Sequence, residues 1–522
     1  MQNEMGQTFW DIFSKSNVKT VTAIIIMLYF CFSCNILLVY YLTEPCSEIS
    51  VLGFKFKKQC KNANKKKIGV DPNTDIIISG SNTIGSRLMP EIIMKFMNNC
   101  QAKKIKKTTV ADNHVKYSAI INGKSVSFVI ISHGTSFGFN MLKNNECHIV
   151  MASREISKGE YHSLWKTFGD LTAYGREIVI ALDGIAIIVH PSNPINSLST
   201  SQVYKIFTGK VKYWKEVLYP KYDIQGLNNS QIKVFIRPKG NSGTFDVFAE
   251  KILGKYYDIP DNAEEIEDNT ELSKKVYYSN KAAIGFVGYP FIRKAKSIAI
   301  YESDEKDKPI TEAYKPNKRT IGLEKYLLSR RLYLYIPETI ERNNNVIRQL
   351  VDFIHEISDI IEQCGYVDKN IIVNPKTSNS DDKDMSISEL LISDSELSTL
   401  NQNELKYFKL KKLLKEPLRM FFFKSCSDLL DNKAMEDVVK VTDYILNNNS
   451  QKIYVFGHAD NQGSLKVNNE LANLRAETVA NRLKENGINP SITIGLGTKW
   501  PIASNNSVEG RLKNRRVEIW IE

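Results

Sequence analysis

Two residues near the C-terminus have the types and the spacing to hold a small zwitterion. Asp460 lies in a polar loop, residues 457–463, and Arg475 lies in the segment of helical period that follows, residues 465–486. A carboxylate accepts hydrogen bonds from an ammonium group, and a guanidinium binds a carboxylate through two parallel hydrogen bonds. If both face one ligand, they would bind the two charges that an amino acid carries on one carbon. A purely structural Asp–Arg pair is the alternative.

The surrounding elements would position this pair. Residues 452–456 read as a short strand before the loop, and Asn468, Leu471 and Arg475 lie on one face of the following helix. Together with the later run Asn514-Arg515-Arg516, this pattern resembles the OmpA-like peptidoglycan-binding domain, from about residue 419 to the C-terminus. The resemblance implies that Asp460 and Arg475 hold diaminopimelate, the cross-linking residue of many bacterial walls. It also implies a peptidoglycan-binding set comprising Asp460, Asn468, Leu471, Arg475 and Arg515.

Three turns in the middle of the chain combine small residues with hydroxyl groups. Each follows an apolar segment that reads as a strand, and they lie at residues 79–85, 132–136 and 240–244. Such turns leave backbone N–H groups unpaired, and Arg154 or Arg237 could neutralise a bound charge. We therefore expect an anion site at the carboxyl ends of strands in an α/β domain. Turns of this composition are also common as purely structural features.

Residues 71–368 resemble the phosphate-specific solute-binding proteins of ABC transporters. The segments that carry the resemblance include Ala181-Leu182-Asp183-Gly184, Ser242-Gly243-Thr244 and Ala283-Ile284-Gly285-Phe286-Val287-Gly288. It implies two α/β lobes that close on a phosphate between them. Carried over by motif, the anion-binding residues are Ser81, Asn82, Thr83, Gly134, Thr135, Ser136, Ser153, Arg154, Arg237, Ser242, Gly243 and Thr244.

Two departures from that family bear on the identity of the anion. Arg237 and Ser242 are five positions apart, where the family typically has four. The family also uses a buried Asp to accept the proton of hydrogenphosphate, and the matching loop here reads His133-Gly134-Thr135. A histidine there could donate rather than accept a hydrogen bond. The expectation is a small-oxyanion site with phosphate as the leading candidate.

The N-terminal region predicts a membrane anchor. Residues 20–42 contain no charged side chain, and this segment is long enough to cross the hydrocarbon core of a membrane as a helix. Lys15 and Lys19 precede the segment and Glu44 follows it, so the first residues are expected in the cytoplasm and the remainder in the periplasm. A cleaved signal peptide is the alternative, but the segment ends in large residues rather than small ones.

Composition restricts the other functional classes. The chain has 522 residues and a net charge of +12, yet no aromatic-rich or helix-turn-helix pattern accompanies the charge, so no nucleic-acid partner is expected. No Gly-x-Ser-x-Gly or His-Glu-x-x-His motif is present, and the cysteine spacings match no metal site. We therefore expect no catalysis, no cofactor and no metal.

These observations predict an α/β chain with a two-lobed binding-protein-like domain and a small OmpA-like domain behind one transmembrane helix. The expected order is a cytoplasmic tail (1–18), a transmembrane helix (19–43), a stalk (44–70), the two-lobed domain (71–368), a flexible linker (369–415) and the OmpA-like domain (416–522). The expected function is a protein of the cytoplasmic membrane that binds a small oxyanion and attaches to peptidoglycan. The alternative is a structural membrane-to-wall tether whose middle domain is an inert spacer.

Overall fold

The structure is a computed structural model. It describes residues 48–51, 54–57, 75–218, 227, 229–239, 242–254, 256–304, 308–372, 398–414, 416–448 and 452–522. The predicted cytoplasmic tail and transmembrane helix lie outside these residues, as does most of the predicted linker. A search of the described helices finds none with the length and apolar character of a membrane span. The chain divides into two compact units, residues 1–69 and 70–522, and the described part of the first is an antiparallel hairpin, β1 (Glu48–Val51) with β2 (Phe54–Lys57).

The second unit begins with a lobe built on a mixed sheet. Parallel strands β6, β3 and β7 form its centre, and the antiparallel strands β5 and β4 extend it to an edge. Their bounds are β3 (Ile76–Gly80), β4 (Lys103–Ala111), β5 (His114–Ile121), β6 (Lys124–Ser132) and β7 (Ile149–Ala152). The helical elements of this lobe are η1 (Ile84–Leu88), α3 (Met89–Asn99), α4 (Thr135–Lys143), α5 (Lys158–Phe168), α11 (Glu338–Asn343), α12 (Asn345–Ile354) and α13 (Ser358–Gln363).

A second lobe continues the same sheet. Strands β10 and β12 run parallel beside β11, and β12 pairs antiparallel with β8. The strands are β9 (Ser197–Ser199), β10 (Lys233–Ile236), β11 (Glu264–Glu265), β12 (Ala283–Gly288), β13 (Lys296–Ser297) and β14 (Ala299–Tyr301). The helices are α6 (Thr200–Phe207), α7 (Trp214–Leu218), α8 (Gly243–Phe248), η2 (Ala249–Leu253), α9 (Asn269–Tyr278), η3 (Tyr289–Phe291) and α10 (Lys318–Gly322).

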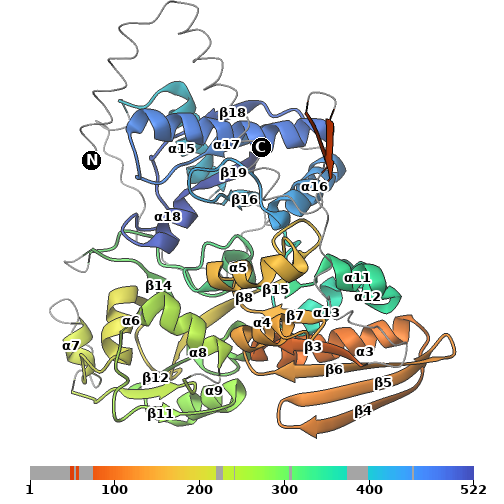
Figure 1. The fold of residues 1–522 in the computed structure, drawn as a ribbon. Helices are drawn as coiled ribbons and strands as arrows, with labels where there is room; N and C mark the ends of the chain where they lie inside the picture. Colours follow the sequence, from red (N-terminus) through yellow and green to blue (C-terminus); the bar gives the residue numbers. More distant parts are fainter. Residues whose placement is uncertain are drawn as a thin grey trace, which may run out of the picture. The chain divides into compact units, whose positions relative to one another are not determined.

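Two long strands join the lobes. The first part of β8 (Glu177–Val189) pairs with β15 (Ser329–Tyr335), and its second part pairs with β12 of the second lobe. β15 also pairs with β7 of the first lobe. The sheet order is therefore β11-β10-β12-β8-β15-β7-β3-β6-β5-β4, and Figure 1 shows the two strands between the orange and the yellow-green lobe. Almost every residue of β8 is buried, as expected for a strand covered on both faces.

The C-terminal domain is a four-stranded sheet with helices on both faces. Its strand order is β16-β19-β17-β18, in which β17 and β18 are parallel. The bounds are α15 (Gln402–Leu414), β16 (Arg419–Phe422), α16 (Asn432–Asn447), β17 (Ile453–Gly457), α17 (Leu465–Glu485), β18 (Ile492–Gly495), α18 (Val508–Asn514) and β19 (Arg516–Ile521). Apolar side chains of α16 and α17 form a core with one face, and Tyr407 and Leu410 of α15 pack with Trp520 on the other.

Candidate functional sites

Hydroxyl groups from the first lobe meet the second lobe at Gly243. A methyl group added to this glycine would lie 3.3 Å from Ser153 Oγ and 3.5 Å from Thr83 Oγ1, and the same position is 3.8 Å from Ser81 Oγ. Ser81 and Thr83 follow β3, Ser153 follows β7, and Gly243 begins α8 after β10. The carboxyl ends of parallel strands from both lobes therefore bring these groups to one point, where ligands bind in open α/β sheets.

The hydroxyl groups are only partly satisfied by the protein. Thr135 Oγ1 lies 3.4 Å from Ser153 Oγ and accepts a hydrogen bond from Ser153 N at 3.1 Å. Ser81 is fully buried, and its Oγ has no hydrogen-bond partner within the described part of the chain. A buried hydroxyl without a partner has lost its hydrogen bonds to water and has gained none within the protein, which costs free energy. Such an atom within a cluster of hydroxyls therefore indicates a binding site for a polar ligand.

Arg330 supplies positive charge beside these hydroxyls, and sequence reasoning missed it. Its Nη1 donates to Gly243 O at 2.8 Å, and its Nη2 lies 3.2 Å from Thr83 Oγ1 and 3.5 Å from Thr244 Oγ1. The side chain is buried and pairs with Asp183 Oδ2 at 2.7 Å, across strands β15 and β8. We name the group formed by these residues the anion cradle: Ser81, Thr83, Thr135, Ser153, Ser242, Gly243, Thr244 and Arg330.

The two arginines that the sequence suggested for the charge have other partners. Arg154 forms a bidentate ion pair with Glu160, which raises the arginine pKa, and donates to Ser136 Oγ at 2.8 Å. Arg237 lies beside the cradle, where its Nε donates to Ser242 Oγ at 3.3 Å and its Nη1 to Ile266 O at 3.0 Å. Burial lowers the pKa of Arg237. Arg154 is therefore neutralised locally, and Arg237 orients Ser242.

The remaining predicted anion-site residues lie around this cluster. Asn82 is half-buried between Ser81 and Thr83, while Gly134 is the N-cap residue of α4 and donates its N–H to Gly80 O at 2.8 Å. His133, for which the sequence suggested a donor role, is exposed and hydrogen-bonds to His114 between their Nε2 atoms at 2.9 Å. Among the described residues, the His133 ring contacts His114 of β5 and Phe137 of α4, and it lies apart from the hydroxyl cluster.

The predicted peptidoglycan-binding residues also come together, but not as the simple pair that the sequence suggested. Asp460 is buried in the loop after β17, and its Oδ2 accepts a hydrogen bond from Arg515 Nη1 at 2.7 Å. Its Oδ1 accepts from Gln462 N at 3.1 Å. Asn468 is buried and Leu471 half-buried on α17. We name the set of Asp460, Asn468, Leu471, Arg475 and Arg515 the wall site.

Arg475 is fully buried and pairs with backbone oxygens rather than with a carboxylate. It donates to Ser427 O at 2.9 Å, His458 O at 3.2 Å and Lys424 O at 3.3 Å, and no ion pair involves it in the part of the chain described. Burial, with the neighbouring charge of Arg515, lowers its pKa to about 10, although Asp460 acts in the opposite direction. The guanidinium therefore lies close to Asp460 with its positive charge uncompensated by a direct partner, as a site for an incoming carboxylate requires.

Comparison with known proteins supports both resemblances. Residues 108–358 match the model of the PBP superfamily domain, and residues 422–515 match that of the OmpA family. The chain is 32% identical over 240 residues to the phosphate-binding protein PstS of Staphylococcus haemolyticus, across 45% of this chain and 69% of that protein. It is 31% identical over 238 residues to PstS of Staphylococcus aureus strain USA300, across 45% of this chain and 67% of that protein. An ABC-type phosphate transport receptor from Vibrio cholerae aligns in structure with a TM-score of 0.41 and 21% identity, across 56% of this chain and 99% of its own.

Proposed function

Because the chain belongs to the family of the phosphate-binding protein PstS and continues into an OmpA-family domain, we propose that it binds phosphate in the anion cradle and peptidoglycan at the wall site. Diaminopimelate is the wall ligand, and residues 19–43 anchor the chain in the cytoplasmic membrane with the rest in the periplasm. The observation that carries the proposal is the meeting of three hydroxyl groups and Arg330 around Gly243.

The cradle suits a small tetrahedral oxyanion because it offers several donors around one point. Hydroxyl groups of Ser81, Thr83 and Ser153 donate to oxygens on different sides of the ligand, and Arg330 supplies charge-assisted donors. Asp183 holds the guanidinium in place from the other side, as oriented partners do at anion sites. Each group binds rather than reacts, so the site is a receptor and not a catalyst.

The wall site suits the two charges of diaminopimelate. Arg475 would bind the carboxylate once the carbonyls that now satisfy it move aside, and Asp460 would accept from the ammonium group. Arg515 holds the Asp460 carboxylate in position through the ion pair with its Oδ2.

Isothermal titration of the detergent-solubilised full-length chain with inorganic phosphate tests the receptor half of the proposal. We expect saturable one-site binding, with sulfate as the competitor that measures selectivity. At about a hundred times its dissociation constant, phosphate should also raise the free energy of unfolding by about 2.7 kcal/mol. Absence of heat and of thermal stabilisation with either anion would leave the structural tether, with an inert spacer, as the better description.

A further inference from the structure

Two neighbouring arginines on β15 connect the anion cradle with the C-terminal domain. Successive side chains of a strand point to opposite faces, and Arg330 contacts the cradle while Arg331 turns away from it. Arg331 is paired with Glu324 at 2.9 Å and with Asp431 Oδ2 at 2.6 Å. Asp431 belongs to the C-terminal domain, where it accepts a hydrogen bond from Ala434 N at the start of α16. One strand thus contributes both an arginine of the anion cradle and the arginine that contacts the C-terminal domain.

Asp431 is also the end of the segment that covers Arg475. This covering segment, residues 424–431, follows β16, and its carbonyls at Lys424 and Ser427 accept the hydrogen bonds of Arg475. With Arg475 fully buried, diaminopimelate reaches the guanidinium only if the covering segment moves. The ion pair between Arg331 and Asp431 therefore holds in place the segment that blocks the wall site.

The C-terminal domain contacts both lobes as well as the strands that join them. Asn432 Nδ2 donates to Thr172 O of the first lobe at 3.0 Å, and Ser504 N donates to Glu302 of the second lobe. Lys513 Nζ donates to Glu324 O at 2.6 Å and to Tyr326 O at 3.0 Å, just before β15. A domain that bridges two lobes keeps all of these contacts in one relative position of the lobes only.

That position is the closed one. Thr83 of the first lobe and Gly243 of the second both contact Arg330, so the lobes meet around the cradle. In this structure, therefore, the lobes are closed and Arg475 is covered at the same time. An anion held by donors of both lobes stabilises closure, because it binds the closed state more tightly than the open one.

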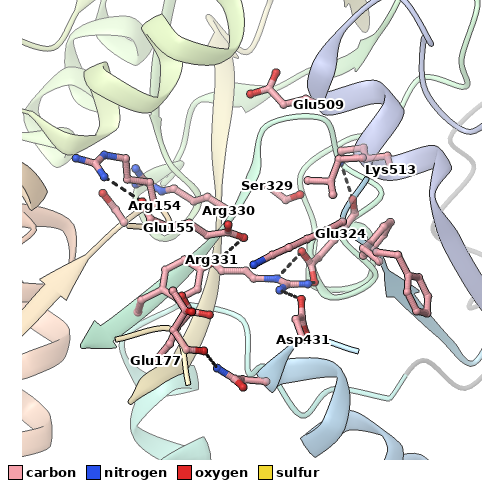
Figure 2. A pocket seen from close by; sticks show the side chains of 18 of the residues that line it. Arg154, Glu155, Glu177, Glu324, Ser329, Arg330, Arg331, Asp431, Glu509 and Lys513 are labelled. Carbon is pink, nitrogen blue, oxygen red and sulfur yellow. Dashed lines mark hydrogen bonds and ion pairs between the residues drawn. The ribbon is translucent and has the colours of Figure 1, made fainter. Parts of the chain in front are cut away.

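A cavity beside the ion pair gives the covering segment room to move. It has a volume of about 850 Å³, and its walls include Arg330 and Arg331, the acid Glu324, and Ser427 and Asp431 of the covering segment. Figure 2 shows Arg331 between Glu324 and Asp431, with Arg330 beside it on the same strand and Lys513 on the opposite wall. Release of Asp431 would let the segment shift into this space without displacing packed side chains.

We propose that phosphate and diaminopimelate oppose each other's binding through the Arg331–Asp431 pair. Phosphate closes the lobes, the closed lobes keep the C-terminal domain docked, and the docked domain keeps Arg475 covered. Diaminopimelate, by displacing the covering segment, loosens the Asp431 contact and favours open lobes. The effect is reciprocal because both ligands act on one equilibrium. This inference rests on the proposed function, and it makes wall attachment strongest when phosphate is scarce.

The test is titration of the full-length chain with meso-diaminopimelate, with and without saturating inorganic phosphate. We expect phosphate to weaken diaminopimelate binding by at least about fivefold, and diaminopimelate to weaken phosphate binding by the same factor. Asp431→Asn should bring both factors close to one, because asparagine still caps α16 but no longer forms the ion pair with Arg331. Phosphate alone should bind this variant about fivefold more weakly than the wild type, as it binds the diaminopimelate-loaded wild type, because the lost ion pair no longer favours closed lobes.

Glu436→Gln is the matched control, because it breaks another ion pair of the same interface, with Lys369, without touching the covering segment. In this variant, phosphate and diaminopimelate should still weaken each other's binding as they do in the wild type. Equal affinities with and without the other ligand, or mutual strengthening, would overturn the coupling while leaving both sites in place. Loss of the coupling in Glu436→Gln would overturn the assignment to Arg331 and Asp431. A wild-type chain that binds neither phosphate nor diaminopimelate alone would instead refute the proposed function itself.

Discussion

The anion cradle and the wall site differ in how their polar groups are satisfied within the protein. In the cradle, Ser81 Oγ is buried without a hydrogen-bond partner among the described residues, and the hydroxyls of Ser81, Thr83 and Ser153 all lie within 4 Å of the position of a methyl group on Gly243. In the wall site, Asp460 is paired with Arg515, and Arg475 has three backbone partners. The first site is organised for a ligand as it stands, whereas the second must break internal hydrogen bonds before it binds.

Because of this difference, the ligand affinity of each site is limited by a different factor. A pre-organised site spends little binding energy on rearrangement, so its affinity reflects its contacts directly. A covered site binds with an apparent affinity reduced by the fraction of molecules in which it is open. We therefore expect substitutions in the cradle to act through contacts with the anion, and substitutions around the wall site to act partly through the covering segment.

Filling the cradle is expected to have the largest effect. In Gly243→Ala, the new methyl group would lie 3.3 Å from Ser153 Oγ and 3.5 Å from Thr83 Oγ1, so the Ser153 hydroxyl must shift by a few tenths of an ångström while the backbone stays in place. Phosphate binding should fall by on the order of 100-fold, while thermal stability without ligand stays near that of the wild type. Isothermal titration measures the first quantity and thermal unfolding the second.

The control is Gly159→Ala in α5, where a methyl group meets nothing within 4 Å. It should leave phosphate affinity unchanged. Wild-type affinity in Gly243→Ala would place the anion outside the cradle and remove the contrast between the two sites.

Removing the charge at the cradle should have the next largest effect. Because loss of Arg330 alone would leave Asp183 buried and unpaired, the informative variant is Arg330→Gln combined with Asp183→Asn. Loss of a charge-assisted contact should weaken phosphate binding about 10- to 100-fold. Arg154→Gln should change it little, because Glu160 already neutralises that arginine. The reverse ranking of the two variants would return the principal charge to the loop arginine that the sequence suggested.

How much of this arrangement the sequence could predict differs between the sites. Hydroxyl turns after strands carry a local signal, so the sequence could predict Ser81, Thr83, Ser153 and the Ser242–Thr244 turn, which the structure brings close together. Arg330 was missed because it lies within an apolar strand, far along the chain from the turns that it contacts. The available signal was a pair of adjacent arginines, Arg330 and Arg331, in a segment otherwise expected to be buried.

The pairing of charges was the harder problem for a related reason. Sequence spacing places Asp460 and Arg475 near each other, but it says nothing of a third group that competes for either one. Arg515 lies 55 positions from Asp460 and reaches it only because β19 pairs with β17. Docking of the C-terminal domain on β15 depends likewise on a partly buried ion pair between distant residues, Arg331 and Asp431, for which no local pattern exists. The fold class follows from hydrophobic periodicity along the chain, whereas the hydrogen-bond and ion-pair partners of each side chain follow from tertiary packing.

A smaller effect is expected from Asp460→Asn at the wall site. The neutral side chain retains the contact with Gln462 N but loses the charge that would hold the ammonium group. Binding to purified sacculi, measured by pelleting, should weaken about tenfold. Glu470→Gln, an exposed change on α17, is the control and should pellet like the wild type. Unaltered pelleting of Asp460→Asn would show that the wall is held elsewhere on this domain.

The last prediction concerns stability rather than ligand affinity, and it tests the docking that keeps the wall site covered. Burial of Lys513, whose Nζ donates to the carbonyls of Glu324 and Tyr326, lowers its pKa from 10.5 to about 7, and the neighbouring charge of Lys251 acts in the same direction. Between these two pH values the unfolded chain binds a proton that the folded chain does not. The free energy of unfolding therefore rises with pH across this window, by about 1.4 kcal/mol per pH unit at most, and is independent of this group well below pH 7.

Lys513→Met should lack that slope, so the wild type should gain stability over the variant between pH 7 and pH 9. Comparing the two proteins by denaturant unfolding at each pH removes the contribution of all other titrating groups. Parallel pH profiles would show that Lys513 is solvated, and hence that the C-terminal domain is not docked on the segment before β15 in solution. The wall site would then lose the contacts that keep it covered, and its contrast with the anion cradle would disappear.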